Sequence, residues 1–304
     1  MTTTNFADTL ISEMRRKQSR LVVGLDPQSD HMPSDLREMS LAHSSLGHTE
    51  GERHRWEIRE FCEQIIKATA DVAVAFKVQI AFFERYGSTG LRILERILGD
   101  HEDKLFIIDC KRGDIGSTSK AYAEAYFHRE EEEDAALLCD AITVNAYLGR
   151  DTLEPFFPYI KTGKGVFVLV KTSNPSSADL QDLKVDGIPV YERMAQHVAE
   201  WGQSFIGNHG YSSLGLVVGA TYPEELKNIR EVLGDSIPFL IPGVGSQGGD
   251  VEKTVEYGTN AKGTMAIVNS SRGIIYAGND ENFAEDARDA ACFLRDEINR
   301  YRPK

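Results

Sequence analysis

The stretch FIIDCKRGDIGST (106–118) holds the residues of this sequence that are best suited to chemistry. Its first three residues are apolar and mostly β-branched, which is typical of a buried strand. Four charged residues follow within six positions, namely Asp109, Lys111, Arg112 and Asp114. Because charges are seldom buried without partners, a buried strand that ends on such a cluster indicates a place where the charges are used.

The spacing of these charges predicts that they share one space. Asp109 and Lys111 are two positions apart on a strand, so their side chains are expected to point the same way. Lys77 ends an earlier apolar run and can approach the same point, while Asp114 follows in the loop, near enough to join them or to reach a neighbouring chain. We interpret the resulting Lys–Asp–Lys–Asp array as catalytic. The alternative, a structural ion-pair network, is less favoured because buried charge pairs stabilise a fold poorly compared with apolar packing.

Eight short apolar runs recur along the 304 residues, with amphipathic helical patterns between them. The runs are continuous rather than alternating, as is typical of parallel strands that are covered on both faces. They are LVVGLD (21–26), VAVAFKV (72–78), LFIIDCK (105–111), AITVNAY (141–147), GVFVLVKTS (165–173), LGLVVGAT (214–221), PFLIPGVG (238–245) and GTMAIVNSS (263–271). This order predicts an α/β fold, a closed (β/α)8 TIM barrel that spans 1–304 as a single domain.

The alternative fold is a doubly wound open sheet. GVGSQG (243–248) fits the dinucleotide-binding pattern G-x-G-x-x-G and follows a predicted strand, which would favour such a sheet. The acidic residue expected about twenty positions further on is missing, and the motif follows the seventh strand rather than the first. The motif therefore carries little weight.

Residues 28–56 interrupt the alternation of strands and helices. The segment is polar and contains four of the eight histidines, His31, His43, His48 and His54. Their irregular spacing and their lack of acidic or Cys partners argue against a metal site. We predict a polar insertion after the first strand, formed by a solvated loop with a short helix.

In a barrel of this kind the chemistry lies at the carboxyl ends of the strands and in the loops that follow. The loops after the last two strands are the usual phosphate site; their glycines let backbone N–H groups approach an anion, and Arg272 can supply a bidentate fork. The alternative for these glycines is a plain tight turn. Nearly every predicted strand ends on a polar side chain: Asp26, Lys77, Asp109 with Lys111, Asn145, Lys171 with Ser173, Thr221, Gln247 in the seventh loop, and Arg272 past the eighth strand.

Composition restricts the classes of partner and location. The net charge of −13 argues against nucleic acid or an anionic membrane as the main partner, although one local group of Lys and Arg suffices for a small anion. The four cysteines are widely spaced without a CxxC pair, which indicates reduced thiols. The first twenty residues lack the apolar segment of a signal peptide, and the apolar runs are too short to span a bilayer. We expect a soluble, cytoplasmic protein.

The motif D-x-K-x-x-D at 109–114 resembles the signature of the orotidine 5′-phosphate decarboxylases, and DCKRGDIGST (109–118) resembles their longer, second bacterial type. The resemblance implies decarboxylation of orotidine 5′-phosphate to UMP, the last step of de novo pyrimidine synthesis, without a metal or an organic cofactor. Further similar segments run in order from the first strand to the last: GLDP (24–27), AFKVQIAFFERYG (75–87), TVNAYLGRD (143–151), LVKTSNPSS (169–177), VVGATYPEEL (217–226), PGVGSQGG (242–249) and SSRGIIYA (270–277).

The resemblance also implies a homodimer with shared active sites and roles for single residues. Lys77, Asp109 and Lys111 would form the charged array with the partner subunit's Asp114. The implied substrate-binding residues are Asp26 and Thr118 at the ribose hydroxyls, Ser173 at the pyrimidine, Gln247 and Arg272 at the phosphate, and Pro242 without an assigned contact. The roles of Asn145, Thr221 and segment 28–56 stay open.

Two alternative functions would require different residues from those expected of an orotidine 5′-phosphate decarboxylase. Related sugar-phosphate decarboxylases and aldolases share D-x-K-x-x-D but use Mg²⁺, and they would want a Glu on the second strand where this chain has Lys77. A non-catalytic nucleotide-binding barrel should have lost part of the charged array, of which no member is missing.

Overall fold

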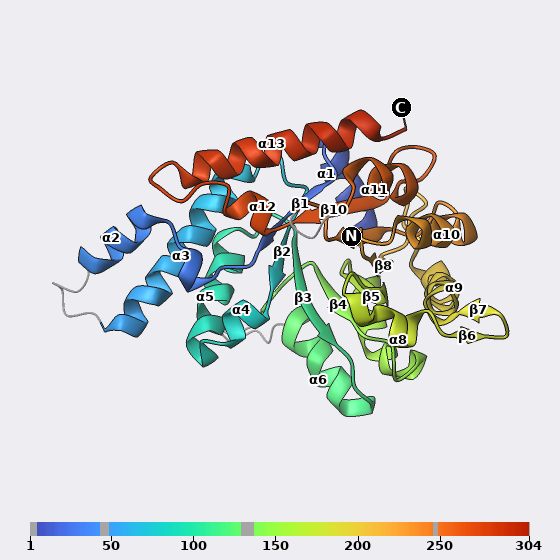
Figure 1. Ribbon diagram of the computed structural model, residues 1–304. Coiled ribbons are helices and arrows are strands. Elements are labelled where there is room, and N and C mark those ends of the chain that lie inside the picture. The colour runs from blue at the N-terminus through green and yellow to red at the C-terminus, as the bar shows by residue number, and fades with distance from the viewer. Residues whose placement is uncertain (1–4, 43–48, 129–136, 246–248, 304) are drawn as a thin grey trace.

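The computed structural model describes residues 5–42, 49–128, 137–245 and 249–303. Its barrel strands are β1 (Leu21–Leu25), β2 (Ala75–Gln79), β3 (Phe106–Arg112), β4 (Ala141–Val144), β5 (Gly165–Lys171), β8 (Leu214–Val218), β9 (Phe239–Pro242) and β10 (Ala266–Ser270). These strands are parallel and form a closed barrel in the order β1-β10-β9-β8-β5-β4-β3-β2 (Figure 1). The (β/α)8 prediction is confirmed, and the open-sheet alternative is wrong because β1 pairs with both β2 and β10. That the whole chain is one domain stays a prediction.

Strand residues alternate between the barrel interior and the helical layer outside it. Phe167 on β5 belongs to the interior cluster, whereas the next residue, Val168, packs in the larger cluster beneath the helices. The interior cluster also contains the apolar face of α1 (Phe6–Lys17), and the rings of Phe6 and Phe167 meet edge to face with centroids 6.0 Å apart. Helix α1 therefore packs against the amino-terminal half of the barrel interior, which leaves the carboxyl ends of the strands for a site.

The remaining helices surround the barrel, and α13 packs against α3 and α11 along one side (Figure 1). They are α2 (Ser34–Ala42), α3 (Glu50–Thr69), α4 (Ala81–Glu84), α5 (Gly87–Asp100), α6 (Gly116–Phe127), α7 (Phe157–Lys161), α8 (Ala178–Gln181), α9 (Val190–Gly202), α10 (Pro223–Leu233), α11 (Val251–Gly258), α12 (Arg272–Ile275) and α13 (Phe283–Tyr301). Short 3-10 turns are η1 (Ser29–His31), η3 (Arg150–Thr152), η4 (Glu154–Phe156), η5 (Pro175–Ser177) and η6 (Gln203–Phe205).

Segment 28–56 contains more helix than the sequence analysis expected, since η1, α2 and the first turns of α3 all lie in it. A capping box begins α3: the Thr49 hydroxyl accepts the Glu52 N–H, and the Glu52 carboxylate accepts the Thr49 N–H at 2.7 Å. This T-x-x-E signal is present in the sequence, so the helix start was predictable. His43 and His48 lie outside the described residues, and within those residues no group of three His, Cys, Asp or Glu could hold a metal ion.

Two features of the strands were not predicted. A small antiparallel hairpin, β6 (Lys184–Val185) with β7 (Ile188–Pro189), follows β5. The pairing of β3 with β4 also shifts register between Ile108 and Arg112, and that of β5 with β8 shifts between Leu169 and Lys171. At such irregularities the side chains no longer alternate regularly between the two faces. Both shifts lie at the carboxyl ends of their strands, where the site is expected.

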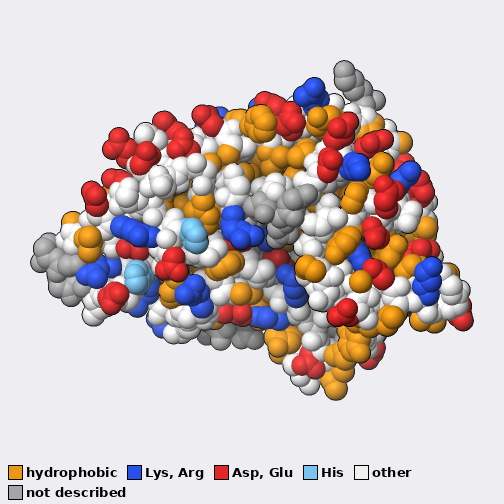
Figure 2. Space-filling model, viewed as in Figure 1, with side chains coloured by type: hydrophobic (Ala, Val, Ile, Leu, Met, Phe, Trp, Pro, Cys, Tyr) orange, Lys and Arg blue, Asp and Glu red, His pale blue; other side chains and the backbone are white. Residues whose placement is uncertain are grey.

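Figure 2 shows acidic side chains along the upper edge of the molecule and several Lys and Arg side chains near the centre of the same face. Among the helices that the structure describes, none has both the length and the apolar composition needed to cross a membrane.

Candidate active site

A cavity of about 520 Å³ lies at the carboxyl ends of the barrel strands. Because parallel strands deliver their last residues to one end of a barrel, this is the place where strand-end side chains can meet. Most of the predicted site residues line it: Asp26, Lys77, Asp109, Lys111, Ser173, Pro242 and Arg272.

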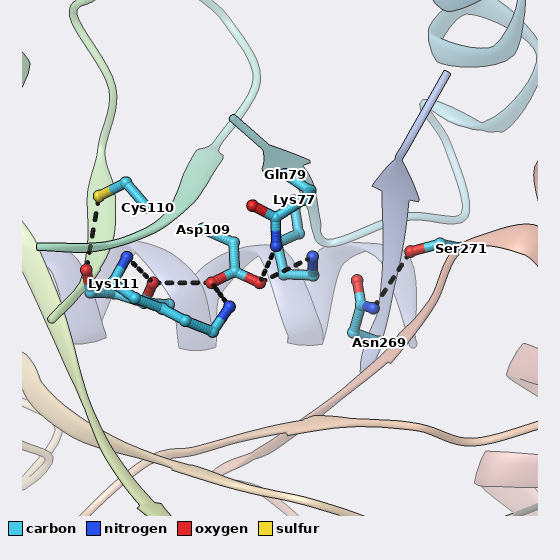
Figure 3. A network of polar contacts seen from close by, with 8 residues as sticks. Lys77, Gln79, Asp109, Cys110, Lys111, Asn269 and Ser271 are labelled. Carbon is cyan, nitrogen blue, oxygen red and sulfur yellow. Dashed lines mark hydrogen bonds and ion pairs between the residues drawn. The ribbon is translucent and has the colours of Figure 1, made fainter. Parts of the chain in front are cut away.

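The Asp109 carboxylate is the centre of the polar network in this cavity, and Figure 3 shows it between side chains from neighbouring strands. Its Oδ2 accepts hydrogen bonds from Lys77 Nζ at 3.3 Å and from Gln79 Nε2 at 3.1 Å. Its Oδ1 accepts from Lys111 Nζ at 2.6 Å and from the Thr143 hydroxyl at 2.8 Å. Four donors therefore fix both oxygens of one buried carboxylate, which orients it and both ammonium groups.

Asp109 and Lys111 both line the cavity, as predicted, although the strand that carries them is irregular there. Lys111 has a φ of 46° and lies within the register shift between β3 and β4. Its backbone N–H donates to the Thr143 hydroxyl at 3.0 Å, the same hydroxyl that donates to Asp109. This left-handed backbone is unusual for a residue with a side chain, and such conformations cluster at functional sites.

Charge, more than burial, sets the ionisation of this network. Burial by itself would raise the pKa of Asp109, but the ammonium groups of Lys77 and Lys111 outweigh it and lower that pKa to about 2. Burial would lower the pKa of Lys77, yet the carboxylates of Asp109 and Asp26 outweigh it and raise that pKa above its usual value. The cavity therefore holds a carboxylate, Asp109, and an ammonium group, Lys77, that both stay charged at neutral pH.

The depressed pKa of Asp109 predicts how stability depends on pH. A carboxyl group whose pKa is lower in the folded state stabilises the fold above its ordinary pKa, here 3.8, and loses that contribution as the pH falls through about 2. The difference in unfolding free energy between wild type and Asp109→Asn should be constant above pH 4 and shrink by about 2 kcal/mol toward pH 2. Urea denaturation between pH 5 and pH 2 measures it. A difference that does not change would mean that Asp109 titrates alike in both states.

Two predicted residues lie outside the cavity wall. Asp114 is partly exposed, and its Oδ1 accepts the backbone N–H of Ile115 at 2.7 Å. Thr118 is exposed on the first turn of α6. Asp114 makes no ion pair with the lysines of the array within the described part of the chain. Of the two alternatives, the structure therefore does not show Asp114 in the array of its own chain, and its contribution from a partner subunit stays a prediction.

The opposite wall of the cavity has the features of an anion site. Pro242 and Gly243 at the end of β9 line it together with Arg272 at the start of α12. Gly243 and Gly245 have φ values of 100° and 80°, a region that favours glycine, so this loop needs glycine for its shape as well as for close approach. Arg272 is exposed, and no carboxylate within the described ranges forms an ion pair with it. Gln247 lies outside the described residues.

Buried acceptors without partners mark a third part of the wall. Asp26 Oδ1 and Asn269 Oδ1 are buried and accept no hydrogen bond from the described residues. Both residues line the cavity, so hydroxyl donors of a ligand could satisfy these atoms. The Tyr276 hydroxyl holds the Asp26 loop, since it donates to the Asp26 carbonyl at 3.2 Å and accepts the Gln28 N–H at 2.7 Å.

Several functional residues escaped the sequence analysis. Gln79 was missed because β2 runs one residue past the predicted end, and Thr143 because it lies within β4 rather than at its end. Asn269 was missed because it lies before the end of the predicted strand 263–271. Its polar side chain in the apolar run AIVNSS could have indicated that it faces a site. Lys171, expected at the rim, does not line the cavity. The other unpredicted lining residues are Gln28, Phe82, Leu169, Thr172, Val217, Val244, Ser270 and Ser271, whereas Gly243 belongs to the glycine loop that was predicted.

Known proteins resemble this chain over nearly all of its length. The Orotidine 5'-phosphate decarboxylase / HUMPS family matches residues 19–287. Orotidine 5'-phosphate decarboxylase from Dechloromonas aromatica (strain RCB) is 42% identical over 300 residues, which cover 98% of this chain and 99% of that protein. The protein of the same name from Azoarcus sp. (strain BH72) is 43% identical over 301 residues, 98% of this chain and 100% of that one.

Solved structures agree with the sequence comparison. The structure of Leishmania donovani OMP decarboxylase superposes with a TM-score of 0.75 at 32% identity and covers 98% of both chains. The similarity in sequence and in structure therefore covers the whole barrel, including the strands that carry the charged cavity. The chain belongs to the orotidine 5′-phosphate decarboxylase / HUMPS family.

Proposed function

We propose that the protein catalyses the decarboxylation of orotidine 5′-phosphate to UMP and CO₂, the last step of de novo pyrimidine synthesis, and that it needs no metal or organic cofactor. The observation that carries this proposal is the Asp109 carboxylate held between the ammonium groups of Lys77 and Lys111 in the cavity. Relatives named orotidine 5'-phosphate decarboxylase at 42% and 43% identity over nearly the full chain support it.

The chemistry requires a stabilised carbanion. Loss of CO₂ from C6 of the pyrimidine leaves an electron pair on a carbon with no carbonyl placed to absorb the charge. An ammonium group held against C6 stabilises that charge and then donates a proton to the carbon. Lys111 suits this role because its side chain is 44% exposed toward the cavity while its Nζ is anchored on Asp109.

Asp109 is expected to destabilise the bound substrate before CO₂ is lost, and its hydrogen bonds keep it oriented for this role. A substrate carboxylate that enters beside the ionised Asp109 is repelled, and its departure as CO₂ relieves that repulsion. The Gln79 and Thr143 donors keep Asp109 in place while this happens. Lys77, buried behind the carboxylate, keeps it charged and holds the array together.

The other walls would bind the parts of the substrate that do not react. Arg272 and the glycine loop after β9 provide donors for the phosphate, and the buried Asp26 Oδ1 can accept from a ribose hydroxyl. Ser173, at the cavity mouth after β5, would contact the pyrimidine. Binding energy from the phosphate, remote from C6, then serves the transition state.

We further propose a homodimer in which the partner subunit's Asp114 completes each active site and Thr118 reaches the partner's ribose. Two features support it. Asp114 and Thr118 lie outside their own cavity, and large apolar side chains are exposed between them and in the loop after β4: Ile115 at 63%, Tyr147 at 73% and Leu148 at 52%. Exposed apolar side chains around unused polar ones are typical of a protein contact surface.

A cytoplasmic location also stays a prediction, supported by four cysteines that form no disulfide.

Arg272→Ala tests the phosphate wall. Removing a charge-assisted contact remote from C6 should lower kcat/KM for orotidine 5′-phosphate by about 2–3 kcal/mol, or roughly 30- to 150-fold. For orotidine, which lacks the phosphate, the same change should have little effect. Steady-state kinetics on both substrates gives the comparison, and Arg300→Ala on α13 serves as an exposed control. Equal losses on the two substrates would assign Arg272 a structural role instead.

The function itself is tested by incubating the purified protein with orotidine 5′-phosphate and following the loss of absorbance. Chromatography should identify UMP as the product in amounts equal to the CO₂ released. If orotidine 5′-phosphate is recovered unchanged, the proposed activity is wrong.

A further inference from the structure

We infer that Lys171 is a positioning residue, which acts through Asp182 to hold the segment that presents Ser173 to the substrate. This inference rests on the proposed function, because it concerns how the pyrimidine end of that site is built. Lys171 was expected in the cavity, and the reason it lies elsewhere carries the argument.

Lys171 is turned out of the cavity by the irregular end of β5. Leu169 lines the cavity, so a regular strand would point Lys171, two positions on, the same way. The register shift between these two residues breaks the alternation. The Lys171 side chain instead lies outside the barrel, 0% exposed, with its Nζ in an ion pair with Asp182 and 4.6 Å from the centre of the Tyr222 ring. The Tyr191 ring centre is 5.5 Å away on another side.

Lys171 ends β5 and is followed by a surface segment, 172–189, which leaves the barrel there and leads into α9. Asp182 lies within this segment, so the ion pair ties the segment back to the strand that it follows. Three of its large apolar side chains face solvent: Leu180 is 47% exposed, Leu183 54% and Val185 53%. Apolar burial therefore contributes little to holding the segment.

Polar contacts hold its base instead. Beside the Lys171–Asp182 pair, the Gln181 side chain accepts the Thr172 N–H at 2.9 Å and donates to the Thr172 hydroxyl at 2.8 Å. We call the four residues Lys171, Thr172, Gln181 and Asp182 the segment clasp. It joins the last residue of β5 and the first residue of the segment to the end of α8.

The clasp is continuous with the backbone around Ser173. The Thr221 hydroxyl donates to the Ser173 carbonyl at 3.3 Å, which gives Thr221 a positioning contact. The Tyr222 hydroxyl donates to the Asn174 carbonyl at 3.3 Å, and the ring of that same tyrosine lies against Lys171. Gly219 completes the fit, because a Cβ there would lie 2.9 Å from the Ser173 nitrogen. Thr221 and Tyr222 therefore hold the backbone at Ser173 and Asn174, and Lys171 packs against the ring of Tyr222.

Stability alone is a weak explanation for this pair. Burying an ammonium group is costly, and apolar residues of similar volume usually stabilise a fold as well or better. Lys171 is fully buried, and the carboxylate that pairs with it among the described residues, Asp182, lies eleven positions further along the chain. The pair therefore fixes where the segment lies. Placement within about 1 Å matters for catalysis, so we expect the clasp to act on the reaction through Ser173.

The test is a double-mutant cycle between Asp182→Asn and Ser173→Ala. Asp182→Asn alone should lower kcat/KM for orotidine 5′-phosphate by about tenfold, mainly through KM, because misplaced Ser173 loses its pyrimidine contact. In the Ser173→Ala background the same change should have almost no further effect. Additive losses would show that Asp182 does not act through Ser173 and would overturn the inference.

Three further variants separate positioning from folding. Lys171→Met should also lower kcat/KM, but it should reduce Tm less than Asp182→Asn does. Loss of Lys171 leaves a carboxylate that is 39% exposed to water, whereas loss of Asp182 strands a fully buried ammonium group. Should Asp182→Asn not fold, Gln181→Ala tests the same clasp without stranding a charge. Lys171→Arg keeps a positive charge that can pair with Asp182, so its kcat/KM should be much closer to that of the wild type than the kcat/KM of Lys171→Met is. If Lys171→Arg is as impaired as Lys171→Met, the proposed positioning role of Lys171 is contradicted.

Lys227→Met is the matched control. Lys227 on α10 also pairs with a carboxylate, Glu231 at 4.0 Å, and lies 5.3 Å from the centre of the Tyr257 ring, but it is 44% exposed. Its removal should leave kcat/KM unchanged, and it should not alter the coupling measured between Asp182→Asn and Ser173→Ala. The outcome is distinct from a failure of the proposed function, because wild type and Lys227→Met must both be active for the cycle to be measured.

Discussion

Lys111→Ala is expected to lower kcat for orotidine 5′-phosphate by about 10⁴-fold or more, because it removes both the proton donor and the cation that faces the carbanion. The fold should survive. Asp109 keeps its hydrogen bonds to Lys77, Gln79 and Thr143, and the Lys111 side chain is partly exposed. Single-turnover and steady-state kinetics measure the loss, and thermal unfolding confirms that the protein is folded.

Lys120→Ala provides the control for this prediction. Lys120 is an exposed lysine on α6 that pairs only at the surface, with Glu124 at 3.5 Å. Its removal should leave kcat unchanged. A Lys111→Ala protein that is folded and retains more than about a hundredth of the wild-type kcat would assign the proton donation to another group.

Mixing two inactive variants should restore about a quarter of wild-type activity if the active site is shared between subunits. In Lys111→Ala every site lacks the proton donor, and in Asp114→Asn every site lacks the neighbour's carboxylate. When subunits exchange, each mixed dimer has one site with both lesions and one with neither. Random pairing makes half of the dimers mixed, and half of their sites are intact.

The alternative arrangement gives a different result. If Asp114 serves its own chain, every site in the mixture keeps one lesion and no activity returns. Mass spectrometry of tagged chains must first show that exchange has occurred. Absence of recovery after confirmed exchange would rule out the cross-subunit site and would leave the exposed side chains of Ile115, Tyr147 and Leu148 without their proposed role.

The barrel was predictable because its strands depend on a pattern that the sequence displays directly. Strands covered on both faces must be apolar throughout, and each of the eight continuous runs became a barrel strand. Most of the residues at the carboxyl ends of the strands were predictable for the same reason. A polar residue at the end of an apolar run marks the place where the strand leaves the core. Helix α3 shows a signal that was present but unused, the capping box at Thr49 and Glu52.

The two register shifts could not be read from the sequence. Lys111 and Lys171 each follow a cavity-lining residue by two positions, Asp109 and Leu169, so the alternation rule treats them alike. In the structure one lysine stays in the cavity and the other lies outside the barrel beside Asp182. Which way a bulged strand end turns depends on partners that are distant in the chain, here Thr143 for the first lysine and the tyrosines of α9 and the β8–α10 loop for the second.

The most direct test of the account is decarboxylation by protein that has been freed of metal. The protein is treated with EDTA, passed through a desalting column and given orotidine 5′-phosphate, and UMP is quantified with and without added Mg²⁺. We predict full activity without Mg²⁺ and no gain when it is added, because the resemblance on which the function was predicted places the Lys77 ammonium group where a metal-using relative would want a Glu. Absence of UMP, or activity that appears only when Mg²⁺ is restored, would contradict the account and favour the sugar-phosphate chemistry of the same barrel family.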